Sequence, residues 1–476
     1  MLHVALLFSV SVMPSVALPS SAGDVPSDGY AALWNDEINA GIDERIEKHR
    51  KADASIGGFP AGAEISVEQI SHDFLFGAHI FNFDQLGRDD WNERYKATYT
   101  NLFNAATVAF YWSDYEPVEG KVRFADGSED GTKFWNAHAD ISAKAKAMLS
   151  KTWRRPAPDP ILKFCRDNGV SVHGHAIVYG SFMPSWTTNL APERLGAAIG
   201  RRIKVLAEHC GDAVAQWDVV NESVCTMATT DEGKYARVNF PRDYTFTSFQ
   251  RAAECFPPCV KLSINDAGVI RKPYVPFVRD LIRRGAKIDV VGVQMHIFSR
   301  EQMRRVADGL PCLPNMTDWA PQDQLAALAM LDTLHRPLHI SEITIPAVDD
   351  TPEGRELQAR LVRDNYRLWF SWPSVVRITW WNMVDYTYAD EHLPSGLYTS
   401  ALEPKPAYHA LDRLINHEWK TRLSLRADAS GRIAFRGFKG QYRLVWKGAD
   451  GRECAKTLHV TSPCARSGAC HSSGLQ

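Results

Sequence analysis

The chain has 476 residues, of which 45% are hydrophobic and 23% are charged, and its formal net charge is -2. This composition is typical of a globular protein, and a charge so near zero excludes partners that are chosen by charge, such as nucleic acid or an anionic membrane. The length still allows one large domain with additions, because a single α/β barrel can take up roughly 250 to 400 residues.

Residues 1–22 form an apolar segment that contains no Asp, Glu, Lys or Arg and that ends in small residues. Such a segment predicts a signal peptide, so we expect a secreted, extracellular protein. Pro14 argues against a membrane-spanning helix in this segment, and no later apolar run approaches a length of about 20 residues. Residues 23–70 then predict a short N-terminal extension, in which a helical stretch at 43–52 precedes an alternating, strand-like stretch at 64–73.

Eight short apolar runs follow, separated by polar loops and by segments with helical spacing. The runs lie at residues 74–81, 105–112, 170–179, 214–222, 260–267, 288–297, 337–346 and 375–385. Continuous apolar strands that alternate with helices indicate a parallel sheet that is covered on its outside, and eight such strands close a barrel. We therefore predict an α/β fold for residues 71–417, a (β/α)8 TIM barrel.

Six of these runs begin with apolar residues and finish on polar or ionisable ones. The polar residues are His175, Asn221 with Glu222, Asn265 with Asp266, Gln294 with His296, Glu342, and Asn382 with Asp385. Because the C-terminal ends of the strands form the active-site face of such a barrel, we expect these side chains to converge there.

Residues 418–462 contain four short alternating runs separated by turn sequences, which predict a small antiparallel β module. This module either binds glycans or packs against the barrel, and we favour packing because it has few aromatic residues. Residues 463–476 are rich in Ser, Gly and Cys and are interpreted as a tail.

The nine cysteines are compatible with an exported protein but are odd in number. Cys255 and Cys259 could close a tight loop, and Cys454, Cys464 and Cys470 could tie down the tail. Scattered structural or free thiols are the favoured interpretation. No Cys and His spacing is typical of a zinc site, so we expect no metal.

Two carboxylates stand out by their position: Glu222 closes the fourth run, and Glu342 lies inside the seventh. In the predicted barrel they face each other across its mouth. Glycosidic bond hydrolysis needs such a pair, because one carboxyl group protonates the leaving oxygen while the other attacks the anomeric carbon or activates water.

The sequence around both residues resembles the glycoside hydrolases of family ten, best known as endo-β-1,4-xylanases. WDVVNE, which ends at Glu222, and HISEITI, which contains Glu342, are similar to the two active-site signatures of that family. Further similar stretches occur in the same order between residues 74 and 412, namely GHAIVY, FxxxPSW, LSINDAG, GVQMHI, ITWWNMVD and EPKPAYHAL.

The resemblance implies a retaining double displacement, with Glu222 as the acid/base and Glu342 as the nucleophile. Asn221 matches a residue that binds the 2-hydroxyl of the attacked sugar, and His296 matches one that hydrogen-bonds the nucleophile. The other residues expected around this sugar are His175, Gln294, Trp381 and Tyr179. The implied mechanism needs no metal or organic cofactor, and the expected partner is a polysaccharide or oligosaccharide. We expect the chain to be a monomer.

The sequence departs from the family beside this predicted site. Thr107, Val108 and Tyr111 replace a Glu-Asn pair and a Lys, and Tyr179-Gly180 replaces Trp-His. Lost hydrogen-bonding groups change substrate selection strongly. We therefore expect cleavage of internal β-1,4 linkages in xylan or a related β-glycan, and the alternative is a carbohydrate-binding barrel whose catalysis has lapsed.

Overall fold

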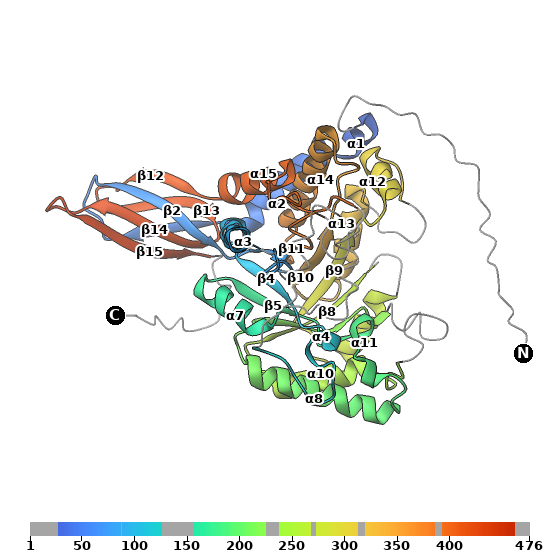
Figure 1. The fold of residues 1–476 in the computed structure, drawn as a ribbon. Helices are drawn as coiled ribbons and strands as arrows, with labels where there is room; N and C mark the ends of the chain where they lie inside the picture. Colours follow the sequence, from blue (N-terminus) through green and yellow to red (C-terminus); the bar gives the residue numbers. More distant parts are fainter. Residues whose placement is uncertain are drawn as a thin grey trace, which may run out of the picture.

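The computed structural model describes residues 27–86, 88–125, 156–224, 238–267, 273–312, 319–385 and 393–461 (Figure 1). The predicted signal peptide, 1–22, and the predicted tail, 463–476, lie outside the described residues. None of the described helices is long and apolar enough to cross a membrane.

The described residues contain the predicted closed barrel of eight parallel strands. The strands are β3 Leu75–His79, β4 Ala105–Ala109, β5 Ser171–His175, β7 Gln216–Asn221, β8 Lys261–Ala267, β9 Val290–His296, β10 Leu338–Thr344 and β11 Val375–Trp380. Each pairs with the next, and the ring closes where β11 pairs with β3. All eight predicted apolar runs therefore form barrel strands, and a two-residue strand, β6 Val178–Tyr179, is added beside the end of β7.

Helices cover the outside of the barrel (Figure 1). They are α3 Asp89–Leu102, α7 Pro158–Asp167, α8 Pro192–Cys210, α10 Tyr244–Cys255, α11 Tyr274–Arg283, α12 Arg300–Ala307, α13 Pro321–Asp332, α14 Pro352–Ser371 and α15 Pro406–Asp412, with the short α4 Trp112–Tyr115. Five of them, α7, α8, α13, α14 and α15, carry Pro in their first turn, where its missing N–H costs no helical hydrogen bond.

Of the neighbouring strands in the barrel, β5 and β7 are paired over the shortest length. Only two residue pairs join these strands, His173 with Gln216 and Gly174 with Trp217. A Cβ atom on Gly174 would lie 2.4 Å from the Trp217 ring, so glycine is required for the indole to pack across the seam. This packing joins the end of β5 to the start of β7, and the end of β7 pairs with β6 instead.

The two ends of the described chain form one β module beside the barrel (Figure 1). Helices α1 Asp28–Leu33 and α2 Asp36–Arg50 lead into β1 Lys51–Gly57 and β2 Glu64–His72, and the C-terminal strands are β12 Arg422–Arg426, β13 Arg432–Phe438, β14 Gly440–Lys447 and β15 Glu453–Val460. β1 pairs with β13, and β2 lies between β12 and β14 in a four-stranded antiparallel sheet. The sequence predicted strands at both ends but not that they pair with each other.

The interior of this module is built from both ends of the chain. Val67 of β2 lies opposite Leu444 of β14 in the sheet, and both side chains are buried. The Tyr442 ring is also buried, and its hydroxyl donates to the Phe438 carbonyl at 2.6 Å. The buried Tyr442 ring fits the packing interpretation of the module better than a glycan-binding face.

Leu444→Ala should lower the free energy of unfolding by about 3 kcal/mol, because it removes buried methyl groups and leaves a cavity between strands from both chain ends. Urea denaturation followed by tryptophan fluorescence measures the loss. Gln441→Ala in the same strand is the matched control, since Gln441 is exposed and its truncation should change stability by less than about 0.5 kcal/mol. Equal losses in both variants would contradict a shared apolar interior.

Candidate active site

Polar side chains from neighbouring strand ends meet at the mouth of the barrel. Glu222 follows β7 and Glu342 lies on β10, and the strands between them, β8 and β9, supply Asn265 and Gln294. The two carboxylates are therefore three strands apart rather than directly opposite. Amide side chains from these intervening strands contact both carboxylates: Asn265 donates to Glu342, and Gln294 donates to Glu222 and Glu342.

Glu342 is buried, with 5% of its surface exposed, and three donors hold its carboxylate. Asn265 and Gln294 donate to Oε1 at 2.7 and 3.0 Å. His296 Nε2 lies 3.1 Å from Oε2. These three contacts fix the position of the carboxylate, as attack by a nucleophile at a defined carbon requires.

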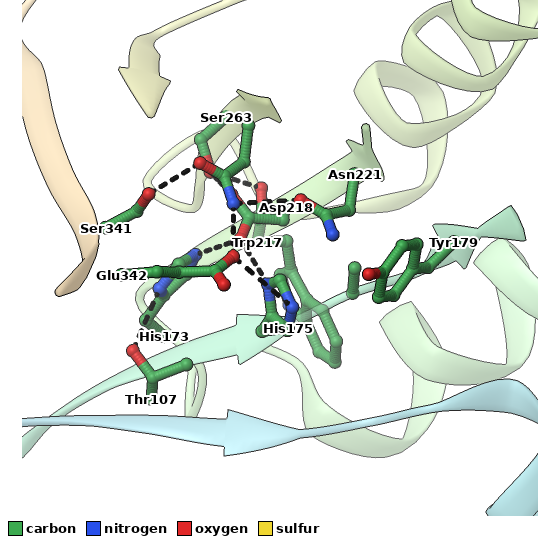
Figure 2. A network of polar contacts seen from close by, with 12 residues as sticks. Thr107, His173, His175, Tyr179, Trp217, Asp218, Asn221, Ser263, Ser341 and Glu342 are labelled. Carbon is green, nitrogen blue, oxygen red and sulfur yellow. Dashed lines mark hydrogen bonds and ion pairs between the residues drawn. The ribbon is translucent and has the colours of Figure 1, made fainter. Parts of the chain in front are cut away.

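The Asn265 side chain is itself fixed by its neighbours. Its Oδ1 accepts from the Ser341 hydroxyl at 2.5 Å, so its Nδ2 must face the site, where it donates to Glu342 and, at 2.8 Å, to Asn221 Oδ1. Figure 2 shows Ser341, Glu342 and Asn221 around this point. Asn265 therefore orients Asn221 as well as Glu342.

Glu222 stands at a point of unusual backbone conformation. Its φ is +55°, in the left-handed region that non-glycine residues rarely adopt and that often marks functional positions. Successive strand residues normally face opposite sides of a sheet. The turn at Glu222 instead lets Asn221 and Glu222 contact the same Gln294 amide, each at 3.3 Å.

The environment of Glu222 favours its protonated form. Burial raises the pKa of the Glu222 carboxyl, and the negative charge of Glu342 raises it further. Hydrogen bonds from Tyr179 and Gln294 oppose that rise without cancelling it. Glu222 therefore tends to keep its proton within the pocket, as a general acid must before the bond is cleaved.

Gln294 also limits the distance between the two carboxyl groups. Its Nε2 lies 3.3 Å from Glu222 Oε1 and 3.0 Å from Glu342 Oε1. The separation of these two oxygens therefore cannot exceed the sum of the two distances, about 6.3 Å.

Two buried donors at the site are unpaired among the described residues. They are Nδ2 of Asn221 and Nε2 of His175, and the latter lies 3.8 Å from Glu342 Oε1. An unsatisfied buried polar group costs about 1 to 3 kcal/mol, so such groups call for an explanation. A bound molecule with hydroxyl groups would satisfy both.

His175 is oriented from below by Asp218, a residue whose role the sequence reasoning missed. His175 Nδ1 lies 2.8 Å from Asp218 Oδ2, and His173 Nε2 lies 3.1 Å from the same oxygen (Figure 2). Ser263 donates to the other Asp218 oxygen at 2.7 Å. The signal that could have found this group is the His-Gly-His pattern of β5 next to an Asp inside the otherwise apolar β7.

These contacts shift the pKa values of both partners. Burial alone would lower the pKa of His175, but its hydrogen bond to Asp218 and the charge of Glu342 raise it overall. Burial alone would raise the pKa of Asp218, but the two imidazoles hold it well below its ordinary value. Asp218 is therefore ionised and supports a protonated His175.

The remaining predicted residues also line the mouth. The Trp381 ring is buried and meets His175 and His296 edge-on, at 5.4 and 5.9 Å between ring centroids. His296 is held on its far side by Thr344 Oγ1, 2.8 Å from Nδ1. The Tyr179 hydroxyl donates to Glu222 Oε1 at 2.9 Å. All eight residues that the sequence assigned to catalysis or to the sugar thus lie in one connected group. Of the other polar residues at the strand ends, Asp385 pairs with Lys405, and Asp266 accepts from the Val224 backbone N–H.

The residues that differ from the family pattern, Thr107, Val108 and Tyr111, lie on the β4 side of the mouth and present few polar groups to it. Thr107 is buried, and its hydroxyl lies 3.3 Å from His173 Nδ1, below the site. Val108 is buried in the barrel core. Tyr111 stacks on Phe182 at 3.9 Å within an aromatic cluster that includes Phe81 and Trp381.

No group of three or more His, Cys, Asp or Glu within the described ranges is arranged to hold a metal ion. Cys255 and Cys259 form no disulfide with each other, and neither do Cys165, Cys210 and Cys454 with any described cysteine.

Comparison with known proteins connects this geometry to a family. Residues 133–413, more than half of the chain, match the sequence profile of glycosyl hydrolase family 10. The chain belongs to this family. The resemblance drawn from the sequence motifs is therefore confirmed at the level of the family.

Relatives of this family 10 chain include two curated proteins that are each 27% identical to it. One is the anti-sigma-I factor RsgI6 of Acetivibrio thermocellus, matched over 88% of this chain and 47% of its own length. The other is endo-1,4-beta-xylanase B of Cellvibrio japonicus, matched over 58% of this chain and 42% of its own length. The matched region thus spans less than half the length of either relative.

Solved structures of family 10 proteins share the fold. Xylanase 10B of Thermotoga petrophila RKU-1, in complex with xylobiose, aligns over 73% of this chain and 95% of its own, with a TM-score of 0.54 and 19% identity. Native xylanase 10B of Thermotoga maritima aligns over 73% and 96%, with a TM-score of 0.54 and 20% identity. At these identities the likeness supports the fold and nothing more specific.

Asp218→Asn should destabilise this family 10 barrel most at acidic pH. The stabilisation that comes from the raised pKa of His175 is present below the ordinary histidine value of 6.5 and is lost as pH rises through the higher folded-state value. We expect a loss of about 3 kcal/mol at pH 5.5, because a buried imidazolium loses its partner, and a smaller loss at pH 9. Urea denaturation at the two pH values measures both.

Asp332→Asn is the matched control for this experiment. The Asp332 carboxylate accepts hydrogen bonds from the Trp372 indole and the Ser374 hydroxyl and from no histidine side chain among the described residues. Its loss should therefore be the same at both pH values. A pH-independent loss for Asp218→Asn would contradict the charge pairing of Asp218 with His175.

Proposed function

We propose that this chain is a retaining glycoside hydrolase that cleaves internal β-1,4 linkages of xylan or a related β-glycan by double displacement. The observation that carries the proposal is the pair of carboxyl groups bridged by Gln294, one favouring its protonated form and the other held by three donors. This pairing of a proton donor with a charged nucleophile is what retaining hydrolysis requires.

The roles follow from the two environments. Glu222, whose pKa is raised by burial and by Glu342, protonates the leaving oxygen. Glu342 attacks the anomeric carbon and forms the covalent glycosyl-enzyme, and water activated by Glu222 then releases the sugar. The upper limit of about 6.3 Å between the facing oxygens supports retention, because inverting enzymes separate their carboxyl groups by about 6.5 to 9.5 Å.

Unpaired donors support a hydroxyl-rich ligand. Asn221 Nδ2 and His175 Nε2 are buried and form no hydrogen bond in the described parts of the chain. We assign Asn221 to the 2-hydroxyl of the attacked sugar, where its hydrogen bond can strengthen toward the transition state. His175, Gln294, Trp381 and His296 enclose the same sugar.

Two observations support the proposed substrate class: the names of the relatives and the aromatic residue at the edge of the site. Proteins named endo-1,4-beta-xylanases are among the relatives, which favours a β-1,4-linked xylan chain. Phe298 stacks on His296 at 4.5 Å and is 54% exposed, so an open aromatic face lies beside the site, suited to a sugar ring. The few polar groups around Thr107 and Val108 leave related β-glycans open as substrates.

A carbohydrate-binding protein whose catalysis has lapsed is the second candidate. The replaced residues Thr107, Val108 and Gly180 favour it. The intact donor set around Glu342 speaks against it, because binding alone does not require a buried carboxylate held by Asn265, Gln294 and His296.

Assays on a panel of xylans and mixed-linkage glucans should release reducing ends. Glu342→Ala should lower this rate on the order of 10⁴-fold or more, as the loss of a covalent nucleophile does. A wild type inert on every β-glycan would sink the hydrolase proposal. Binding of xylo-oligosaccharides by that inert protein, measured by calorimetry, would establish the second candidate instead.

Proton NMR during hydrolysis should show the β-anomer of the new reducing end first, since two displacements retain configuration. Glu222→Ala should abolish cleavage of the glycan but keep cleavage of aryl glycosides with acidic leaving groups, which need no proton. Added azide should then yield a β-glycosyl azide. Initial formation of the α-anomer would contradict the retaining mechanism.

Export and a monomeric state are also part of the proposal. Export is supported by the apolar segment at residues 1–22. A single chain carries every residue that the proposed mechanism uses, which supports a monomer.

A further inference from the structure

Tyr179 reaches the site through an unusual short strand. After β5 ends at His175, the chain adds β6, in which Val178 and Tyr179 pair with Val220 and Asn221 at the end of β7. This register sets Tyr179 next to the residue that precedes Glu222. Figure 2 shows the Tyr179 ring beside Asn221, with its hydroxyl directed toward the centre of the network.

The hydrogen bonds to Glu222 are asymmetric. The Tyr179 hydroxyl donates to Oε1 at 2.9 Å, and Gln294 Nε2 donates to the same atom at 3.3 Å. Every side-chain hydrogen bond that Glu222 receives from the described residues therefore falls on Oε1, and Oε2 receives none.

Tyr179 can act only as a donor to Glu222. Burial raises the pKa of its phenol, so the hydroxyl keeps its proton. A hydrogen bond from the Ser181 side chain opposes the rise of this pKa without cancelling it, and the phenolic proton is donated to Glu222 Oε1.

This asymmetry decides where a protonated Glu222 carries its hydrogen. An oxygen that already faces two donor hydrogens cannot also bear a proton without bringing like partial charges together. The carboxylic acid therefore carries its hydrogen on Oε2, the oxygen that is free to meet a leaving group.

We propose that Tyr179 is a positioning residue for the acid/base: its hydroxyl holds Oε1 of Glu222 as an acceptor and so directs the transferable proton to Oε2. This inference rests on the proposed function, because it assigns Glu222 the transfer of a proton to the leaving oxygen. It gives the Tyr179 hydroxyl a task that a phenylalanine ring of the same shape could not perform.

Tyr179→Phe tests the proposal through the leaving group. On an unbranched oligosaccharide, xylohexaose or its gluco counterpart, kcat/KM should fall about tenfold, a part of the 10²- to 10⁴-fold that positioned proton transfer contributes. On a 2,4-dinitrophenyl β-bioside of the same sugar, which leaves without a proton, kcat/KM should stay within about twofold of wild type. A merely structural role would lower both equally.

The pH profile gives a second readout. The Tyr179 hydrogen bond favours the ionised form of Glu222, so its loss should raise the pKa of that carboxyl. The alkaline limb of kcat/KM, which reports deprotonation of the acid, should therefore move to higher pH in Tyr179→Phe. An unchanged alkaline limb together with equal losses on both substrates would overturn the proposal.

Two further variants complete the experiment. Tyr366→Phe is the matched control, because the Tyr366 hydroxyl is buried in α14 without a partner among the described residues, and both substrates should be cleaved as by wild type. Ser181→Ala should change the ratio of the kcat/KM values on the two substrates in the same direction as Tyr179→Phe, but by a smaller factor. It provides the test if Tyr179→Phe does not fold. A wild type inactive on both substrates would overturn the proposed function itself, whereas an active wild type with no selective loss overturns only the role of Tyr179.

Discussion

The site depends on one constraint: two carboxyl groups share a buried pocket, and their charges must be kept unequal. Like charges a few ångströms apart in a poorly solvated site repel strongly, so both groups cannot be ionised without compensation. The chain compensates one of them. Three donors surround Glu342, whereas Glu222 has its contacts on a single oxygen and its pKa is raised. Asn265 and Gln294 do this work because they come from the two strands that separate the carboxylates.

The barrel supplies the precision that this arrangement needs. Parallel strands bring their C-terminal ends to one face, so residues distant in sequence meet without long loops. Below that face, Asp218 and Ser263 hold His175 in a fixed orientation. Above the end of β5, β6 extends the pairing with β7 just far enough to set Tyr179 beside Asn221. The layers beneath and beside the carboxylates thus determine which atoms face a bound sugar.

The barrel strands and most of the site residues could be predicted from the sequence, because each is marked by a pattern within a short stretch of the chain. A strand that is buried on both faces is written as a continuous apolar run, and a polar residue at its end is visible in the sequence. The same reasoning could not reveal partners that lie far apart along the chain. The pairing of β2 with β14 leaves no mark in either segment, since both alternate as any half-buried strand does. In the sequence, Asp218 is one polar residue within a largely apolar strand, and its histidine partners lie far away in the chain, on β5. The hydroxyl of Tyr179 was expected near a sugar, and its hydrogen bond to Glu222 depends on the register of a two-residue strand.

The β module joins the segment that precedes the barrel to the segment that follows it. β2 ends at His72 and β12 begins at Arg422, and these two strands lie side by side in one sheet. In terms of chain connectivity, the whole barrel is therefore one long loop whose two ends are held together by this strand pairing. The entropic cost of closing such a loop rises only slowly with its length, by about 0.6 kcal/mol per doubling. A single break in a surface loop of the barrel would therefore leave both fragments tethered through the module. The barrel of this chain should in this way stay assembled after a nick, because the two fragments remain paired in the β module.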